Sequence, residues 1–246
     1  MAFLLLPLAG LLIRAPWGHL GAALSGSDAS QALVLSLWTA TVTTAISLLI
    51  GVPLAWVLAR TTFPGQRLLR ALVTLPLVLP PVVGGVALLL AFGRTAIIGQ
   101  YLNSWFGLTI PFTPLAVVMA ETFVAMPFLI ITVEGALRSA DQGFEEAAAT
   151  MGAKRMTVFL RVTVPLVAPS LGAGAVLCWA RALGEFGATI TFAGSFPGQT
   201  ETMPIAVYYA LETDPDAAIA LSLVLLLVSV VVLVSLRDHW LRGGSV

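Results

Sequence analysis

The sequence has 246 residues, of which 59% are hydrophobic and only 10% are charged, and its mean hydropathy is +1.00. A soluble domain carries roughly 25% charged residues, so this composition excludes an ordinary soluble protein and indicates one that lies in a membrane. The zero net charge gives no sign of a nucleic-acid-binding surface, the single cysteine, Cys178, excludes an internal disulfide, and the two histidines lack the spacing of zinc ligands.

Six apolar stretches are candidates for membrane-spanning helices, which need about 20 mostly apolar residues. The first, residues 1–17, has thirteen residues before Arg14 and reaches span length only if the Arg14 side chain extends toward the membrane surface. It lacks the basic leading region and cleavage site of a signal peptide, so we predict a retained span. The others are residues 31–59, 71–93, 114–133, 167–193 and 217–236. We predict an all-α integral membrane protein with about six spans in a single domain, residues 1–246.

The third stretch contains helix breakers. Pro76, Pro80 and Pro81 precede the paired glycines Gly84 and Gly85. Prolines leave backbone carbonyls without donors, so this helix should bend or be interrupted. Two interpretations stay open, a tolerated kink and a broken helix that lines a transport pathway.

The positions of lysine and arginine predict the orientation, because short cytoplasmic loops are enriched in both. The side predicted to be cytoplasmic carries Arg60, Arg67, Arg70, Arg138, Lys154, Arg155, Arg161, Arg237 and Arg242. The opposite side carries only Arg14 and Arg94. We therefore predict that both termini and residues 134–166 are cytoplasmic.

Residues 134–166, between the fourth and fifth spans, are too many for a simple turn. Ser139 and Asp141 can cap the start of a helix, and Gly152, followed by basic residues, can end it after about ten residues. The apolar residues Phe144, Ala148 and Met151 would share one face of this helix. A helix this short is marginal alone in water, so we predict that it binds a partner or its own loop.

The stretch contains, in order, Glu146, Ala147, Ala148, Gly152, Val162, Val164 and Pro165. This spacing resembles the EAA loop of ABC-importer permeases, E-A-A, three residues, G, nine residues, I-x-L-P, with valine at both aliphatic positions. The resemblance implies a type I ABC-importer permease fold, in which this loop forms a coupling helix that docks into the ATPase subunit. It assigns ATPase coupling to Glu145, Glu146, Ala147, Ala148, Gly152 and Pro165. A generic amphipathic linker helix is the alternative.

Residues 181–208, with GEFGAT followed by PGQTETMP, are similar to the corresponding segment of molybdate permeases and, in the first part, of sulfate permeases. The resemblance implies a homodimer in the cell inner membrane that imports molybdate or tungstate, with sulfate or thiosulfate as the alternative. It also implies two ABC ATPase subunits on the cytoplasmic side and an external oxyanion-binding protein that docks near Trp105 and residues 195–202.

The chain lacks the glycine-rich phosphate-binding loop of an ATPase. We therefore predict that it is not an enzyme and binds no cofactor, and that ATP and Mg²⁺ are bound by a partner subunit. An ATP-independent channel or secondary transporter would explain the spans but not the EAA spacing. A membrane-embedded enzyme is least favoured, because few ionisable residues share one depth.

The fifth span carries Arg181 and Glu185 four residues apart, on one helix face. An unpaired charge at the centre of a membrane helix costs roughly 2.5–3.5 kcal/mol, so an ion pair is expected, with direct contact to the passing anion as the alternative. The candidates for lining the pathway are Arg181, Glu185, Thr189, Thr191 and Ser195. Glu121 would repel an anion, so we expect it to face another helix, or to be protonated or paired.

Overall fold

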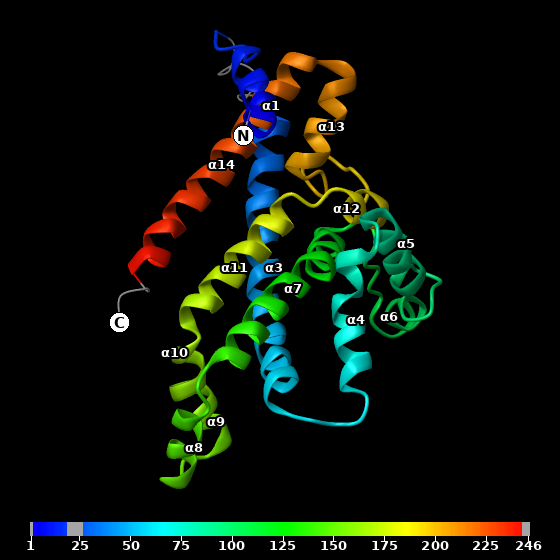
Figure 1. Ribbon diagram of the computed structural model, residues 1–246. Coiled ribbons are helices and arrows are strands. Elements are labelled where there is room, and N and C mark those ends of the chain that lie inside the picture. The colour runs from blue at the N-terminus through cyan, green and yellow to red at the C-terminus, as the bar shows by residue number, and fades with distance from the viewer. Residues whose placement is uncertain (1, 19–26, 243–246) are drawn as a thin grey trace.

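The computed structural model describes residues 2–18 and 27–242, and every regular element in this part of the chain is a helix, as predicted. The helices are α1 (Ala2–Ile13), α3 (Ser27–Arg60), α4 (Gln66–Val78), α5 (Pro81–Phe92), α6 (Gly99–Phe106), α7 (Pro114–Ser139), α8 (Gly143–Thr150), α9 (Arg155–Val158), the π-helix η1 (Phe159–Thr163), α10 (Val164–Leu166), α11 (Ala168–Leu183), α12 (Gly187–Phe192), α13 (Met203–Thr213) and α14 (Pro215–Arg242). They form an elongated bundle with α13 near one end and α8 and α9 at the other (Figure 1).

Three helical segments in the described residues are long and apolar enough to cross a membrane alone: Asp28–Arg60, Pro114–Ser139 and Pro215–Val232. They correspond to the second, fourth and sixth predicted spans, and two bent helix pairs raise the number to five if each pair is one span. The 12 residues of α1 extend only about 18 Å, less than the roughly 30 Å of a hydrocarbon core. A first span over residues 1–17, of which Met1 lies outside the described residues, thus stays a prediction.

The stretch 71–93 is two helices, α4 and α5, with an angle of 119° between them. Leu79, which precedes Pro80, is extended with φ −72° and ψ 131°, as expected for a residue before proline. Pro81 then begins α5, where its missing N–H removes no hydrogen bond. The prolines therefore interrupt the helix, as one of the two interpretations of the sequence expects, and the stretch 71–93 consists of a helix, a sharp turn and a second helix. That this break lines a transport pathway stays a prediction.

The fifth predicted span is also interrupted. It consists of α11, a break at residues 184–186 and the short helix α12. Residues 134–166 before it are largely helical: α7 continues to Ser139, α8 follows, and Arg155–Leu166 form a helical segment bent by 76° from α11. Pro165 lies just before this bend, and the i→i−5 hydrogen bond from Val164 to Phe159 forms the π-helical turn that precedes it.

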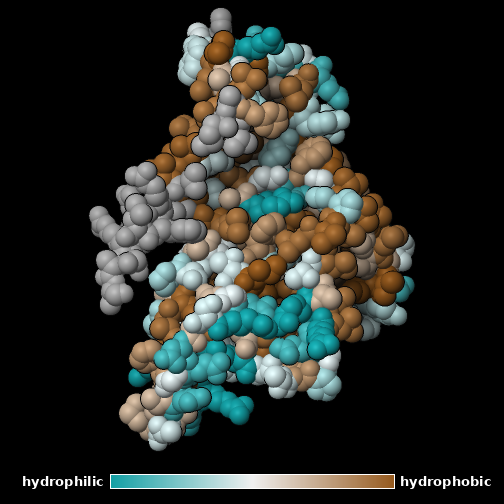
Figure 2. All heavy atoms as spheres, in the orientation of Figure 1, coloured by the Kyte–Doolittle hydropathy of each residue, from teal (hydrophilic) through white to brown (hydrophobic). Residues whose placement is uncertain are grey.

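The core of the bundle lies between α3 and α7, which pack along each other, and α11. Leu58, Leu129 and Ile130 are fully buried there. A second cluster around Phe192 joins α5, α7 and α12, and a third around Met203 joins α3, α13 and α14. In Figure 2 hydrophilic residues gather at the end that carries α8 and α9, and hydrophobic residues cover much of the surface beyond it.

Candidate functional site

Specific backbone contacts begin and end the helix α8. At its start, Asp141 Oδ1 accepts a hydrogen bond of 2.9 Å from the Gly143 N–H. Ser139 does not act as a cap, because its hydroxyl donates to the Gly135 carbonyl within α7. After α8, Gly152 has φ +85°, a left-handed conformation that favours glycine, and the Ala153 N–H returns to the Ala148 carbonyl at 3.1 Å. The predicted helix of about ten residues thus has eight.

The apolar stripe predicted on α8 is only partly buried. Ala148 is buried, but Phe144 is 61% exposed and Met151 is 83% exposed. Glu146 and Ala147 are also exposed. Large apolar side chains open to water beside a carboxylate are typical of a surface that another protein covers.

Glu145 points back into the chain. Its Oε1 accepts hydrogen bonds from Arg60 Nη2 at 3.1 Å and Arg60 Nε at 3.3 Å, and the two side chains are only 15% and 6% exposed. Arg60 is the last residue of α3, and one turn earlier Trp56 makes an edge-on ring contact with Phe159 of η1. Both contacts fix the α8–η1 region to the end of α3.

A second charged cluster lies close by. Oε1 of Glu134 accepts from Arg70 Nη2 of α4 at 2.8 Å and pairs with Arg138 Nη2 at 2.9 Å. The Leu58 carbonyl accepts a 2.8 Å hydrogen bond from the side chain of Gln66. The sequence pattern singles out these arginines only as cytoplasmic charges, although the i,i+4 spacing of Glu134 and Arg138 indicates one of the two pairs.

The expected ion pair of the fifth span is formed. Arg181 Nη1 lies 2.7 Å from Glu185 Oε2, and the Glu185 side chain is 1% exposed while that of Arg181 is 28% exposed. Glu185 Oε1 also accepts a 2.8 Å hydrogen bond from the Ala188 N–H, at the start of α12. This carboxylate therefore bridges the break between α11 and α12.

The three hydroxyl residues proposed for the pathway have different surroundings. Thr189 is fully buried within the chain. The half-buried Thr191 donates to the Gly187 carbonyl at 2.8 Å, and Ser195 donates to Glu201 Oε2 at 3.1 Å. Their contact with an anion stays a prediction, as does that of Arg181. Pro165, assigned to coupling, is exposed beside the bend before α11.

Glu121 faces α3. The Thr39 hydroxyl donates to its Oε1 at 2.8 Å and the Thr43 hydroxyl to its Oε2 at 3.0 Å, and the residue is only 2% exposed. Thr39 and Thr43 belong to a row of buried hydroxyl residues on α3, with Ser36 and Ser47, at spacings of three and four residues. The spacing of these four residues shows in the sequence that they share one face of a helix. That this face contacts Glu121 of α7 is apparent only from the packing of the two helices.

Replacing Glu121 with leucine is expected to destabilise the protein more than replacing it with glutamine. Leucine removes the carboxylate that accepts from both threonine hydroxyls and leaves each hydroxyl with only its 3.3 Å hydrogen bond to a backbone carbonyl, that of Ser36 for Thr39 and that of Val118 for Thr43. The loss of a hydrogen bond of this kind typically costs about 0.5–1.5 kcal/mol. Glutamine keeps one oxygen, and a hydroxyl can rotate to accept from the amide. Thermal unfolding of the purified variants in one detergent measures the difference. Equal unfolding temperatures for the two variants would contradict this role.

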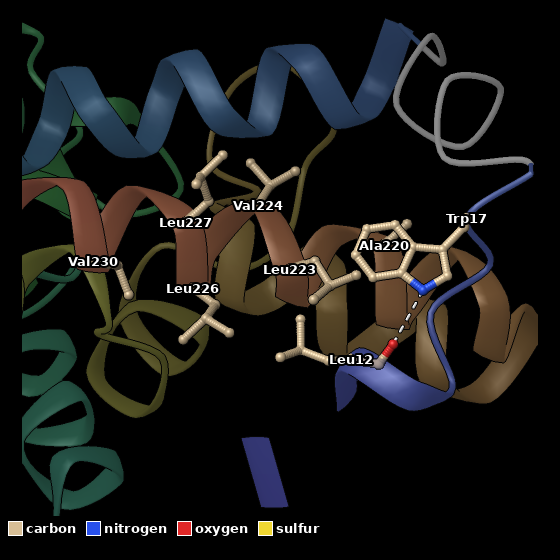
Figure 3. A pocket seen from close by; sticks show the side chains of 8 residues that line it. All are labelled: Leu12, Trp17, Ala220, Leu223, Val224, Leu226, Leu227 and Val230. Carbon is tan, nitrogen blue, oxygen red and sulfur yellow. Dashed lines mark hydrogen bonds between the residues drawn. The ribbon is translucent and has the colours of Figure 1, made fainter. Parts of the chain in front are cut away.

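An apolar cavity of about 370 Å³ lies between α1 and α14 (Figure 3). Its walls are the side chains of Leu12, Trp17, Ala220, Leu223, Val224, Leu226, Leu227 and Val230. The Trp17 indole N–H is engaged with the Leu12 carbonyl at 3.2 Å. The eight side chains that line this cavity therefore offer no free hydrogen-bond donor to an oxyanion. We conclude that this cavity is not the anion site.

The long apolar helices, their interrupted partners and the short exposed helix at the polar end together define a multi-pass membrane protein. Residues 47–243 match the model of the family described as "Binding-protein-dependent transport system inner membrane component". The chain belongs to this family. It is therefore a membrane permease component of an ABC importer and not the ATP-hydrolysing subunit, as predicted.

The chain is similar to proteins named "Molybdenum transport system permease protein ModB". The one from Mycobacterium tuberculosis is 50% identical over 94% of this chain and 88% of that protein. The one from Escherichia coli is 41% identical over 87% of this chain and 94% of that protein. "Sulfate transport system permease protein CysT" from Salmonella typhimurium is 35% identical over 98% of this chain and 88% of that protein.

Two solved structures share the fold. One is a bacterial ABC transporter involved in import of the acidic polysaccharide alginate, with a TM-score of 0.76 and 18% identity, covering 99% of this chain and 91% of that chain. The other is the MetNI methionine ABC transporter in inward-facing conformations, with a TM-score of 0.64 and 20% identity, covering 90% of this chain and all of that chain. The type I importer permease fold is confirmed.

Proposed function

We propose that the chain is the permease subunit of an ATP-driven importer that carries molybdate, or the similar tungstate, into the cytoplasm by alternating access. The substrate is supported by residues 181–208 and by the molybdenum permeases at 41% and 50% identity, against 35% for the sulfate permease. The observation that carries the coupling mechanism is the exposure of α8 with the EAA spacing at the polar end of the bundle, because a permease of this family needs a surface for its ATPase.

The geometry of α8 divides the proposed coupling residues into two groups. Glu146 and Ala147, with the apolar Phe144 and Met151, are exposed and would contact the ATPase. Glu145 and Ala148 face the chain and would hold the helix in place. Gly152 would support this surface by allowing the left-handed end of α8.

The proposed assembly is a homodimer with two ABC ATPases at α8, which bind ATP and Mg²⁺, and an external binding protein near Trp105 and residues 195–202. Trp105 is 72% exposed and is therefore available for such a contact. Both termini would then be cytoplasmic. The anion would pass along the interface between the two copies, where partly exposed donors such as Arg181 can attract it without trapping it.

Reconstitution into vesicles tests this function. We expect uptake of labelled molybdate only when the ATPase, internal ATP and the external binding protein are all present, because this chain supplies no phosphate-binding loop. Excess unlabelled tungstate should compete, and excess sulfate should compete weakly.

The same vesicles distinguish the alternatives. Uptake that follows a molybdate gradient without the ATPase would favour a channel or secondary transporter. Uptake of sulfate in preference to molybdate, with a binding protein that retains sulfate, would assign the chain to sulfate transport.

A further inference from the structure

The helix α3 reaches both ends of the molecule. Its 34 residues extend about 51 Å, well beyond the roughly 30 Å of a hydrocarbon core. In Figure 1 it runs from the neighbourhood of α13 toward the end that carries α8 and α9. Pro53 lies inside this helix and removes one backbone hydrogen bond, but the helix continues on both sides of it, and Ala55 and Leu58 of the following turns are fully buried in the core. A displacement at one end of α3 is therefore passed to the other end through a helix held by its packing.

At the docking end, α3 holds α8 through a shielded contact. The Arg60 guanidinium and the Glu145 carboxylate are 6% and 15% exposed, so water competes little for either group. Such charge-assisted hydrogen bonds are stronger than neutral ones. Trp56 and Phe159, with ring centroids 5.6 Å apart, add an apolar contact between α3 and η1. A force applied to α8 therefore acts on the end of α3.

At the other end, α3 holds the segment 195–203. The Met203 N–H donates a 2.8 Å hydrogen bond to the Ser36 hydroxyl oxygen, and both residues are 1% exposed. Gly198 lies so close to α3 that a Cβ atom built on it would be 2.5 Å from Gln31 Oε1. The segment thus rests on α3 at two points.

Between the two ends, Glu121 of α7 accepts from Thr39 and Thr43 of α3. These hydrogen bonds join the two helices in the middle of the bundle, so α3 cannot slide on α7 without losing them. Motion of α8 is then carried along α3 instead of being absorbed between the helices.

We propose that α3 is the mechanical link between the docking helix α8 and the segment 195–203, with Arg60 and Ser36 as its positioning residues. This inference rests on the proposed function, because ATPase docking at α8 supplies the motion. In this proposal Arg60 and Ser36 bind neither nucleotide nor anion. Arg60 keeps α8 attached to the end of α3, and Ser36 keeps Met203 attached near its start.

The test measures thiol accessibility in the segment 195–203, beside the start of α3, in variants that change Arg60 at the end of α3. Gln199 is exposed and the native thiol, Cys178, is buried, so Gln199→Cys gives a single accessible thiol, with the unmodified chain as background control. In the assembly with its ATPase, the thiol-labelling rate at position 199 is expected to change when ATP and vanadate are added. We expect Arg60→Met to remove this change while ATPase binding and basal hydrolysis persist. We expect Ser36→Ala to reduce it by about tenfold, the size of an ordinary coupling between two sites.

Restoring the ion pair separates coupling from simple stability. The exchange of charges in Arg60→Glu with Glu145→Arg is expected to recover most of the labelling change. Trp56→Phe keeps an aromatic ring against Phe159 and should leave the labelling change intact. If Arg60→Met does not fold, Ser36→Ala alone decides the question. A full nucleotide-dependent change at position 199 in Ser36→Ala and in every folded Arg60 variant would overturn the link. Failure of the unmodified chain to bind the ATPase would instead overturn the proposed function, and this inference with it.

Discussion

Glu146→Lys is expected to reduce substrate-stimulated ATP hydrolysis and molybdate uptake to background, while the chain still inserts into the membrane. Glu146 is exposed in the first turn of α8, and none of the ion pairs among the described residues involves it. The helix dipole favours an anion at this position by about 0.3–1 kcal/mol, a contribution that lysine reverses. The larger effect is on docking, because the ATPase would meet a cation in place of a carboxylate.

Two matched variants separate charge from fold in this experiment. Glu146→Gln keeps the size of the side chain and should retain part of the stimulated hydrolysis. Thr157→Lys places the same lysine at an exposed position of α9 that the EAA signature leaves unspecified, and should leave most of the activity. ATPase binding to purified permease and uptake into vesicles are the measurements. If Glu146→Lys is stimulated as strongly as Thr157→Lys, α8 is not the docking surface.

The membrane class and the long helices are predictable from the chain because hydrocarbon imposes a simple rule. Every backbone group must be paired within the segment, so apolar runs such as 31–59 and 114–133 become helices. The interruption at Pro80 and Pro81 follows from local chemistry as well. Its angle of 119° does not, because it depends on how closely Gly84 and Gly85 allow α5 to approach its neighbours.

The candidate site on α8 also has features that the local sequence predicts and features that depend on tertiary packing. The position of α8 and its glycine end are local features, readable from Asp141 and Gly152. The inward turn of Glu145 is not local, because its partner, Arg60, lies 85 residues earlier in the chain. Adjacent glutamates in one helix turn thus have different surroundings, one paired within the chain and one exposed, and only the tertiary packing distinguishes them.

Gly85→Val is expected to abolish transport and to lower the unfolding temperature of the permease. A Cβ atom built on Gly85 would overlap Thr191 Oγ1, and it would lie 2.7 Å from the Ala188 carbonyl oxygen and 2.9 Å from the Ala188 Cα. The threonine side chain can rotate, but the backbone of α12 cannot withdraw without disturbing the Glu185 cap at its start. Overpacking of this kind typically costs about 1–3 kcal/mol, and here it would also push α5 away from α12.

Control variants test whether close packing of the two backbones is the cause. Gly172→Val introduces the same side chain into α11, where a Cβ atom meets nothing within 4 Å, so it should keep near-normal stability and uptake. Adding Thr191→Ala to Gly85→Val should not rescue transport, because the Ala188 backbone stays in place. Rescue by Thr191→Ala would mean that the obstruction is a side-chain clash, and that α5 and α12 tolerate a wider separation during transport. A Gly85→Val variant as stable and active as Gly172→Val would contradict the close contact itself.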